Sequence, residues 1–264
     1  MNRPKLVALD LDGTLLSSRH TISERNQRAI RALRDRGVMV LICTGRPIRS
    51  ALVYARQIGL TDLAILYNGA VVYDFDRNTA RYQFCLSQDH TLAVIDSLRE
   101  RFPGASETVE TVDGWYTNPT RYDAMDEPSV LPSGVGDVRD FVCNGVGEST
   151  VKCLFSHGDI DAPTLASAID GLPVYRTWSS PTMLEVMARG VNKQVALERV
   201  ATEFGIDRSE IAAFGDQNND IEMLSWVGYG VAMGNAAEDV KQAADVVTAS
   251  NDEDGVAEGL EPFL

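Results

Sequence analysis

Four aspartates near the two ends of the chain stand in two short acidic motifs. Asp10 and Asp12 belong to an Asp-Leu-Asp-Gly-Thr motif, and Asp216 and Asp220 belong to a Gly-Asp-Gln-Asn-Asn-Asp motif. Each motif directly follows a short apolar run of the kind that forms a buried strand. Carboxylates that gather at strand ends repel one another unless a hard cation such as Mg²⁺ holds them. We therefore expect the two ends of the chain to build one metal-dependent active site.

The segments that must position these carboxylates alternate between strand and helix patterns. Continuous apolar runs predict buried strands over Leu6–Leu9, Val38–Cys43, Leu63–Tyr67, Ile211–Phe214, Tyr229–Met233 and Asp245–Thr248. Helix starts are expected at a capping box over Thr21–Glu24, at Pro47, at Asn192 and at Asn219. Such alternation is typical of an α/β fold with a doubly wound parallel sheet, which binds its ligands at the carboxyl ends of the strands.

The middle of the chain lacks this regular alternation. It mixes helix and strand patterns over Asp89–Arg101, Val151–Phe155, Val174–Trp178 and Met183–Val186, the last two as a hairpin. We therefore predict a catalytic core from residues 1–81 and 188–264, with an α+β domain inserted as residues 82–187. Gly134 and Gly136 precede no helix with the dinucleotide-binding spacing, so a Rossmann cofactor site is not supported.

Composition narrows the partners and the compartment. A net charge of −14 argues against nucleic acid or an anionic membrane as partner. It does not exclude a small anion, because charges farther away than about 8 Å are screened at physiological salt. No apolar run is long enough to cross a bilayer, and the N-terminus lacks the apolar region of a signal peptide. The cysteines have no metal-binding spacing and fit a reducing cytoplasm; they are Cys43, Cys85, Cys143 and Cys153.

Further polar groups are expected beside the carboxylates. Thr44, Gly45 and Arg46 follow the second predicted strand, and Lys193 stands at the start of a predicted helix. A hydroxyl, backbone amides and an ammonium beside carboxylates and a cation form a phosphate site. Taken singly, Thr44 could cap the helix after Pro47 and Lys193 could be solvated. Their joint order at the ends of strands favours the phosphate site.

The acidic motifs also have two simpler explanations. Asp12 and Gly13 between apolar runs could form a type I′ hairpin turn if the motif stood alone. An EF-hand calcium loop needs Gly at its sixth position and Glu at its twelfth. Counted from Asp10 or from Asp216, those positions hold other residues, which excludes an EF-hand.

In these motifs the chain resembles the haloacid dehalogenase-like (HAD) phosphatases, specifically the Cof-type hydrolases with a class IIB cap. Four family motifs match in order: the nucleophile motif at residues 10–14, the hydroxyl motif at 43–46, the lysine motif at 190–193 and the second acidic motif at 215–220. Asn68-Gly69-Ala70 before the insertion and residues 183–186 at its end also look Cof-like. One departure is Gln194, where such sequences usually have Gly after the lysine. The resemblance spans essentially the whole chain.

The resemblance implies a role for each matching residue. Asp10 would attack phosphorus and form an aspartyl-phosphate, while Asp12 would protonate the leaving oxygen and then activate the water. The carboxylates of Asp10 and Asp216 and the backbone carbonyl of Asp12 would bind Mg²⁺. Lys193 would offset the charge of Asp10. The groups that contact phosphate or substrate would be Thr44, Gly45, Arg46, Lys193 and Asn219, with Asp220 supporting them from behind.

The resemblance also makes the inserted domain a cap that selects the leaving group. Its polar and aromatic candidates are Trp115, Tyr116, Lys152, Trp178 and Glu185, although aromatics at such positions more often pack in a core. We therefore predict a cytoplasmic, Mg²⁺-dependent phosphatase of small phosphorylated metabolites. Sugar phosphates come first among its substrates and phosphorylated cofactors second, while the oligomeric state is left open.

Four other functions compete with this prediction. Cys43 and Arg49 have the spacing of cysteine-dependent phosphatases, but Pro47 lacks a backbone N–H and no His precedes the cysteine. A phosphosugar mutase of the same superfamily would pass the aspartyl-phosphate to a sugar hydroxyl instead of water. A non-catalytic phosphometabolite-binding protein is disfavoured by the complete set of nucleophile, acid, lysine and metal ligands. The carbon–halogen branch is disfavoured because Asp12 supplies a proton donor for a leaving oxygen.

Overall fold

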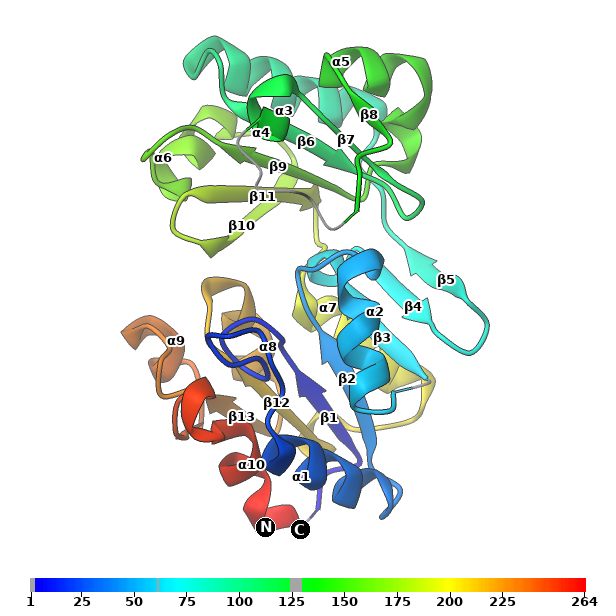
Figure 1. Ribbon diagram of the computed structural model, residues 1–264, viewed down its shortest axis with the longest axis vertical. Helices are drawn as coiled ribbons and strands as arrows, with labels where there is room; N and C mark the ends of the chain where they lie inside the picture. The colour runs from blue at the N-terminus through cyan, green and yellow to red at the C-terminus, as the bar shows by residue number, and fades with distance from the viewer. Residues whose placement is uncertain (1–2, 61, 124–129) are drawn as a thin grey trace. The chain divides into compact units, whose positions relative to one another are not determined.

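The computed structural model describes residues 3–60, 62–123 and 130–264. The chain divides into two compact units, which we call the core unit (Met1–Tyr82 with Asn192–Leu264) and the inserted unit (Gln83–Val191). Each unit has its own sheet (Figure 1). Each also has its own apolar cluster. Among the described residues, no helix combines the length and the apolar character that crossing a lipid bilayer requires.

The core unit is built on an eight-stranded sheet. Its strands, in order across the sheet, are β14 (Val246–Val247), β13 (Tyr229–Ala232), β12 (Ile211–Gly215), β1 (Leu6–Leu9), β2 (Met39–Cys43), β3 (Leu63–Leu66), β4 (Val71–Asp74) and β5 (Thr79–Gln83). All neighbours from β14 to β3 are parallel, which confirms the predicted doubly wound arrangement.

The edge of this sheet beyond β3 departs from the parallel pattern. Strand β4 pairs antiparallel with β3, so that Leu66 lies opposite Val71. The chain reverses between them over residues 67–70 without a crossover helix. A strand–helix alternation predicts only parallel neighbours, because parallel strands need such a crossover. The sequence pattern therefore did not reveal β4.

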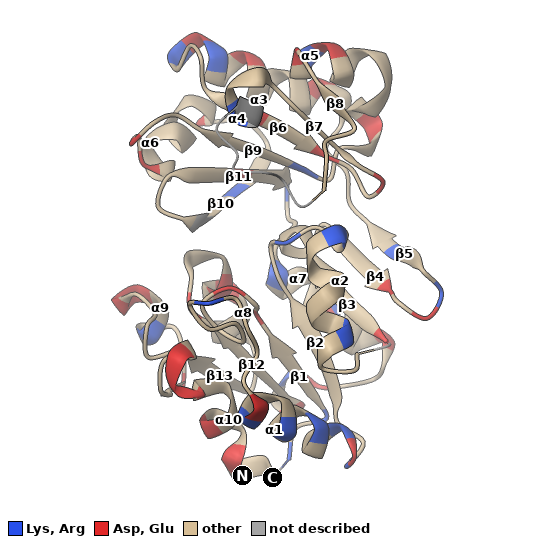
Figure 2. Cartoon of the chain, in the orientation of Figure 1, with Lys and Arg blue, Asp and Glu red and all other residues tan. Residues whose placement is uncertain are grey.

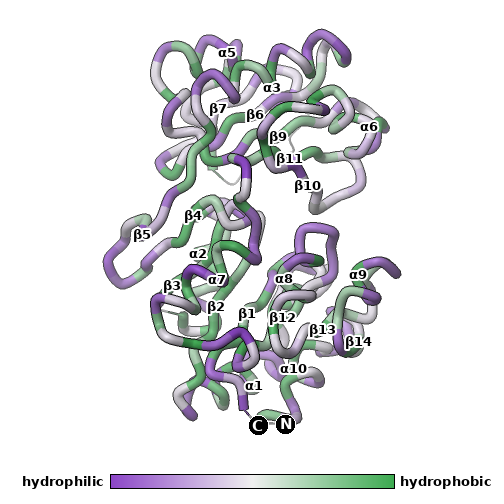
Figure 3. The backbone as a smooth tube through the Cα atoms, turned by 180° about the vertical axis from the view of Figure 1, so that it is seen from behind, coloured by the Kyte–Doolittle hydropathy of each residue, from purple (hydrophilic) through white to green (hydrophobic). Residues whose placement is uncertain are grey.

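Helices cover both faces of the core sheet. They are α1 (Glu24–Arg34), α2 (Ile48–Gln57), α7 (Lys193–Glu203), α8 (Ile221–Trp226), α9 (Glu238–Gln242) and α10 (Gly255–Leu260). Apolar side chains of α7, α8 and α9 pack with Ala8 and Ala213 on one face. On the other face α10 contacts Phe214, and α1 packs beside α10 (Figure 1). The central strands are therefore buried on both sides, which explains the hydrophobic colour of β1, β2 and β3 in Figure 3.

The N-cap predicted for α7 agrees with the structure, and the one predicted for α1 differs from it. Asn192 is the N-cap of α7, as predicted, and its side chain accepts a hydrogen bond from Val195 N–H over 2.8 Å. The capping box predicted at Thr21 is wrong, because Ser23 is the N-cap of α1 and accepts from Asn26 N–H. Hydroxyl residues two positions apart offer the same cap chemistry, so the sequence pattern did not separate them.

The inserted unit has a six-stranded sheet of its own. Its strand order is β10 (Val174–Ser180), β11 (Met183–Ala188), β9 (Lys152–Ser156), β6 (Ser106–Glu110), β7 (Trp115–Thr117) and β8 (Gly134–Val135). Its helices are α3 (Gln88–Arg101), α4 (Pro119–Asp123), α5 (Val138–Phe141) and α6 (Ala162–Ala166). The predicted hairpin is confirmed as β10 with β11, which pair antiparallel.

The two faces of this second sheet differ in chemistry. Side chains of α3, α5 and α6 pack against Val109 and Cys153 in an apolar cluster. Because side chains alternate between faces along a strand, the adjacent residues Glu110 and Lys152 lie on the opposite face. Glu110 and Lys152 are also opposite each other in the register of β6 and β9. One face of the sheet is thus apolar and helix-covered, and the other has buried charges.

Candidate active site

Parallel pairing brings the ends of three strands to one edge of the core sheet. In register, Leu9 of β1 lies beside Phe214 of β12 and Ile42 of β2. The residues that follow these strands therefore emerge side by side, Asp10 after β1 and Asp216 after β12. The backbone N–H of Asp10 donates to the carbonyl of Phe214 over 3.1 Å, which extends the pairing up to the first acidic motif.

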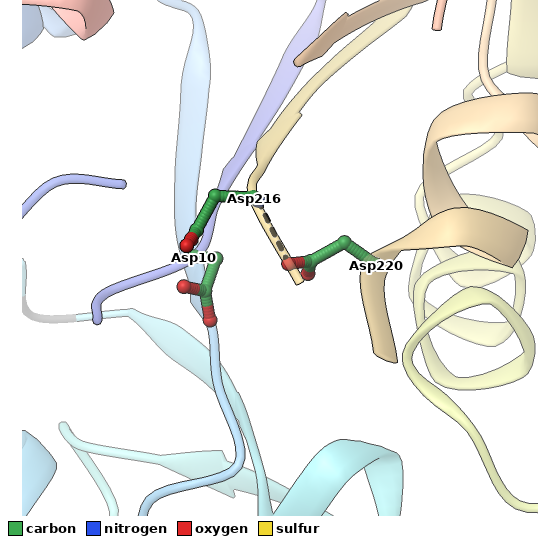
Figure 4. A group of neighbouring side chains, drawn as sticks. All are labelled: Asp10, Asp216 and Asp220. Carbon is green, nitrogen blue, oxygen red and sulfur yellow. Dashed lines mark hydrogen bonds between the residues drawn. The ribbon is translucent and has the colours of Figure 1, made fainter. Parts of the chain in front are cut away.

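Three carboxylates converge at this edge. One oxygen each from Asp10, Asp216 and Asp220 lies within 4.8 Å of the others, and Figure 4 shows the three side chains directed toward one another. The residues are only 5%, 2% and 0% exposed. Buried carboxylates this close together need compensating cations or protons.

Lys193 supplies one of these cations. It is the first residue of α7, and its side chain is fully buried. Its Nζ donates to Asp10 Oδ1 and to Asp220 Oδ1, each over 2.7 Å. Burial alone would lower the pKa of Lys193, but attraction to the two aspartates outweighs it and raises the pKa well above its ordinary value. The lysine is therefore charged.

Two of the carboxylates, Asp10 and Asp216, resist ionisation even beside this lysine. Burial raises the pKa of Asp10 well above its ordinary value, and repulsion from Asp220 and Asp216 adds to the effect, against the attraction of Lys193. Burial, followed by repulsion from Asp220, raises the pKa of Asp216 to about 7. Three carboxylates with one ammonium have an excess of negative charge and present oxygen atoms. This donor set fits a hard divalent cation such as Mg²⁺.

Asp220 has a different environment from the other two acids. Its Oδ2 accepts hydrogen bonds from the backbone N–H groups of Asp216 and Gln217, each over 3.1 Å, and its Oδ1 accepts from Lys193. Both oxygens are therefore engaged by protein donors. Asp216 accepts from side-chain donors, at Oδ1 from Thr14 over 2.8 Å and at Oδ2 from Gln217 over 3.2 Å. Backbone donors hold Asp220 firmly beside Lys193, whereas the side-chain donors of Asp216 can turn away when a cation binds, so the pattern is compatible with Asp10 and Asp216 as cation ligands.

The glycine of the first acidic motif is required for steric reasons. Gly13 has a φ of +79°, and a Cβ atom there would lie 2.2 Å from Asp216 Oδ2. Only glycine permits so close an approach of the two acidic motifs with this left-handed backbone. The next helix or strand after Gly13 is α1, so the hairpin-turn alternative is wrong.

The structure pairs Arg46 with Asp12. Arg46 Nε donates to Asp12 Oδ2 over 2.6 Å, and Nη2 donates to Asp12 Oδ1 over 2.5 Å. The guanidinium also lies over the ring of Tyr54, 5.0 Å from its centre. A bidentate arginine fixes both the position and the plane of a carboxylate. The sequence predicts Arg46 as a phosphate or substrate group, which stays a prediction, and the structure adds its contact to Asp12.

Thr44 and Asn219 are buried beside a residue that the sequence analysis left without a role. Thr44 is 1% exposed, and its Oγ1 accepts from Arg46 N–H over 3.2 Å. Asn219 Nδ2 donates to Asn68 Oδ1 over 2.9 Å. A Cβ atom at Gly45 would lie 2.8 Å from the same oxygen of Asn68. The available signal was an Asn-Gly pair directly after a buried strand, which is typical of a special backbone conformation.

Two aromatic candidates of the inserted unit, Tyr116 and Trp178, are explained by packing. Tyr116 and Phe141 have ring centres 5.2 Å apart. Tyr116 and Trp178 both pack against the apolar cluster of this unit, and Trp115 is 5% exposed. Large apolar side chains in such positions stabilise a core, so these contacts alone do not indicate a ligand site.

The charged candidates of the inserted unit form a buried cluster. Lys152 Nζ lies 3.5 Å from Glu110 Oε2 and 3.6 Å from Glu185 Oε1, and all three side chains are at most 4% exposed. Lys152 and Glu185 were predicted as candidates from the sequence, and Glu110 was not. Charged residues are rarely so buried unless they are paired, so the three form one electrostatic group.

Cys43 lies in the apolar cluster of the core unit and is 0% exposed. Burial is the largest cause that raises the pKa of its thiol far above the ordinary value. The thiol is therefore protonated at neutral pH, whereas the thiolate is the reactive form. This environment argues against the cysteine-dependent phosphatase.

Known proteins are similar to this chain over nearly its whole length. The family model of haloacid dehalogenase-like hydrolases matches residues 7–260. The 5-amino-6-(5-phospho-D-ribitylamino)uracil phosphatase YitU of Bacillus subtilis (strain 168) is 36% identical over 99% of this chain and 98% of its own length. A second phosphatase of that name in the same organism, YcsE, is 34% identical over 98% of this chain and 96% of its own length.

Solved structures are similar in both sheets. The HAD subclass IIB sugar phosphatase BT4131 has a TM-score of 0.85 at 27% identity, covering 98% of each chain. The phosphatase BT1666 from Bacteroides thetaiotaomicron has a TM-score of 0.84 at 28% identity, covering 99% of this chain and 95% of its own.

Proposed function

The chain belongs to the haloacid dehalogenase-like hydrolases and is a phosphatase, and from that premise we propose that it is Mg²⁺-dependent and forms an aspartyl-phosphate on Asp10. One observation supports this proposal best. The Nζ of Lys193 bonds to Asp10 and Asp220 at once, inside a cluster of three buried carboxylates. An aspartate held by an ammonium beside an acidic cluster can approach an anionic ester, because positive charge offsets the repulsion.

Asp10 and Asp12 divide the reaction between them. Asp10 Oδ attacks phosphorus, the bond from phosphorus to the leaving oxygen breaks, and that oxygen takes a proton from Asp12. In the second step Asp12 takes a proton from water, the water oxygen bonds to phosphorus, and Asp10 is released with inorganic phosphate. Arg46 holds both oxygens of Asp12, so the carboxylate keeps one orientation. A nucleophile that is regenerated in this way splits one difficult displacement into two easier ones.

The proposed metal ligands are the carboxylates of Asp10 and Asp216 and the backbone carbonyl of Asp12. When bound, Mg²⁺ supplies charge neutralisation for the phosphoryl oxygens. Lys193 adds a second positive charge, and Asp220 holds the lysine in place. Uncatalysed hydrolysis of phosphate monoesters is slow enough for accelerations of up to ~10²¹-fold, so no single contact suffices.

The remaining groups are proposed to bind phosphate. Thr44 accepts a hydrogen bond from Arg46 N–H, so its own hydroxyl proton is directed elsewhere and can donate to a phosphoryl oxygen. The backbone N–H of Gly45 and the carboxamide of Asn219 are the other neutral donors in this set. Lys193 supplies the charged donor.

We propose phosphate esters of polyols and sugars as the first substrate class. Two relatives are named for a phosphoribityl compound, and one solved relative is a sugar phosphatase. Phosphorylated cofactors such as pyridoxal phosphate and flavin mononucleotide come second. Residues 82–187 are proposed to act as the specificity domain, with Lys152 and Glu185 as its polar candidates.

Phosphate release from a panel of esters tests this proposal. The panel contains 5-amino-6-(5-phospho-D-ribitylamino)uracil, pentose and hexose phosphates, pyridoxal phosphate and flavin mononucleotide, each with Mg²⁺ and with EDTA. We expect the wild type and Cys43→Ser to hydrolyse at least one ester with Mg²⁺, and Asp10→Asn to hydrolyse none. Turnover by Asp10→Asn would refute the aspartyl-phosphate, and turnover in EDTA would refute the metal role. A phosphorylated product without free phosphate would instead indicate a mutase.

A further inference from the structure

Tyr67, Asn68 and Gly69 form a strained connection that has no part in the proposed mechanism. They follow β3, whose carboxyl end lies at the same sheet edge as that of β2. Their φ angles are 51°, 55° and 98°. Glycine adopts such left-handed values freely and asparagine tolerates them, but they are unfavourable for tyrosine. Backbone strain persists where surrounding contacts enforce it, and it gathers at functional sites.

Backbone contacts join this connection to two parts of the active site. The N–H of Asn68 donates to the carbonyl of Thr44 over 3.1 Å. At Gly69, a Cβ atom would lie 2.2 Å from the backbone oxygen of Asn192, the residue before Lys193. The connection is therefore packed between the Thr44 loop and the start of α7.

The side chain of Asn68 reaches the second acidic motif. It is 1% exposed, and its Oδ1 accepts the hydrogen bond from Asn219 Nδ2 over 2.9 Å. Asn219 is 4% exposed, and its own Oδ1 has no hydrogen-bond partner within the described part of the chain. A buried amide oxygen without a partner is unfavourable unless a ligand or an ordered water meets it. The Asn219 carboxamide thus has one end anchored and the other end available.

We propose that Asn68 is a positioning residue for the phosphate site, because it fixes the orientation of the Asn219 carboxamide. One N–H of Asn219 is bound to Asn68, so the amide cannot exchange its nitrogen and oxygen ends. The second N–H then keeps a fixed direction and can donate to a phosphoryl oxygen, while Oδ1 can accept from water or a substrate hydroxyl. An amide turned the other way would present an oxygen to the phosphate and repel it. This inference rests on the proposed phosphatase function and on Asn219 as a phosphate ligand.

A glycine substitution separates this role from a purely structural one. Asn68→Gly removes the carboxamide but suits the left-handed backbone, because glycine has no Cβ to clash. Asn78 provides a matched control, since it is also a left-handed asparagine, with φ of 51°, in an exposed turn. Its Oδ1 accepts a hydrogen bond from Tyr73 Oη over 3.0 Å, in the same unit but outside the site. Asn78→Gly therefore reproduces the chemical change without the contact to Asn219.

The experiment is a double-mutant cycle on phosphate binding. The dissociation constant of inorganic phosphate is measured by calorimetry with Mg²⁺, and KM and kcat are measured with p-nitrophenyl phosphate. We expect Asn68→Gly to weaken phosphate binding by about five- to tenfold, the effect of one lost hydrogen bond, and to raise KM more than it lowers kcat. Asn219→Ala should weaken binding at least as much. The double variant should bind phosphate like Asn219→Ala alone, and Asn78→Gly should bind like the wild type.

Three results would overturn the inference. The first is unchanged phosphate affinity in Asn68→Gly. The second is a double variant weakened by the product of both single effects, because Asn68 would then act independently of Asn219. The third is an equal loss in Asn78→Gly. Binding is measured well below the lowest unfolding midpoint, so that loss of the fold cannot imitate loss of the contact.

A second variant of Asn68 guards against misfolding of the first. The measurement of phosphate binding keeps the test separate from the proposed catalytic mechanism. Asn68→Asp keeps an acceptor oxygen and tolerance of the left-handed backbone, so it completes the same cycle if Asn68→Gly does not fold. Because the acceptor is retained, Asn219→Ala should still weaken phosphate binding in the Asn68→Asp background, and no further loss there would contradict the inference. Turnover by Asp10→Asn would refute the proposed mechanism, but the phosphate-binding cycle would still report on Asn68.

Discussion

The ammonium of Lys193 donates to two buried aspartates, Asp10 and Asp220. Replacing this lysine should therefore affect both catalysis and stability. Breaking a buried ion pair by deleting one partner typically costs about 3–5 kcal/mol. We expect Lys193→Met to lose phosphate release and to unfold at a lower temperature, while its circular dichroism spectrum keeps the secondary structure. Added Mg²⁺ should recover part of the lost stability, because it neutralises the same carboxylates. Lys241→Met on α9 should change neither property, and wild-type turnover in Lys193→Met would contradict the role of this lysine.

The Arg46–Asp12 pair leads to a prediction about leaving groups. Arg46→Met removes the bidentate contact, so Asp12, the proposed proton donor, loses its fixed orientation. General acid catalysis typically contributes about 10²–10⁴-fold, and it matters most for poor leaving groups. We expect the variant to lose at least tenfold more turnover with an alkyl phosphate than with p-nitrophenyl phosphate, whose phenolate leaves without a proton. Arg56→Met, an exposed arginine of α2, is the control, and an equal loss with both esters would show that Arg46 acts elsewhere.

At the scale of single strands, the buried charges of the inserted unit lead to a prediction about stability. Lys152 on β9 lies between Glu110 on β6 and Glu185 on β11. Lys152→Met keeps the length of the side chain but leaves two buried carboxylates without their shared cation. We expect a loss of about 3–5 kcal/mol in the free energy of unfolding, measured by urea denaturation. The control is Arg139→Met, which breaks an exposed ion pair and should leave stability unchanged; equal stability of both variants would contradict the prediction.

The same elements explain which parts of the structure could be predicted. Strands β1, β2 and β12 are buried on both faces, so they appear as continuous apolar runs in the sequence. Parallel pairing then requires the residues that follow them to meet at one edge, which is why Asp10 and Asp216 were predicted together. Strand β4 was missed because a short reversal, rather than a helix, precedes it.

Contacts between side chains were harder to predict from the sequence than the arrangement of the backbone. The bond from Asn219 to Asn68 joins residues 151 positions apart, and no sequence period links them. Arg46 was assigned to phosphate because it follows Thr44, whereas its direction toward Asp12 depends on a side-chain rotamer. Glu110 was missed because a single charged residue in a strand usually faces solvent. Motif spacing therefore predicted which segments meet, but not which atoms bond within the meeting point.

Over the whole molecule, an acidic protein has to bind an anionic ester. The chain has a net charge of −14, and Figure 2 shows acidic residues on α9 and α10 as well as at the site. Charges beyond about 8 Å are largely screened at physiological salt. We therefore expect the local charges near Lys193, together with the proposed cation, to determine whether phosphate is attracted, and the global charge to have little influence.

In the metal-free protein we expect the contribution of Asp216 to stability to fall as pH rises. The ordinary pKa of an aspartate is 3.8, whereas burial and repulsion from Asp220 raise the pKa of Asp216 to about 7 in the fold. Between these values the native protein binds more protons than the unfolded chain, so the free energy of unfolding decreases with pH. Below the lower value both states are protonated and the stability is fully present. Above about pH 7 both are ionised and the loss levels off.

Mg²⁺ should reverse this trend, because it binds the ionised carboxylates and only weakly the protonated ones. We expect the rise in unfolding temperature caused by saturating Mg²⁺, relative to EDTA, to be small near pH 5 and to increase up to about pH 8. Calorimetric titration near pH 6 should also show protons released into the buffer as the cation binds. In Asp216→Asn the rise should be smaller at every pH and should lose most of its pH dependence. A wild-type rise that is independent of pH would mean that the cation binds elsewhere than at these buried acids.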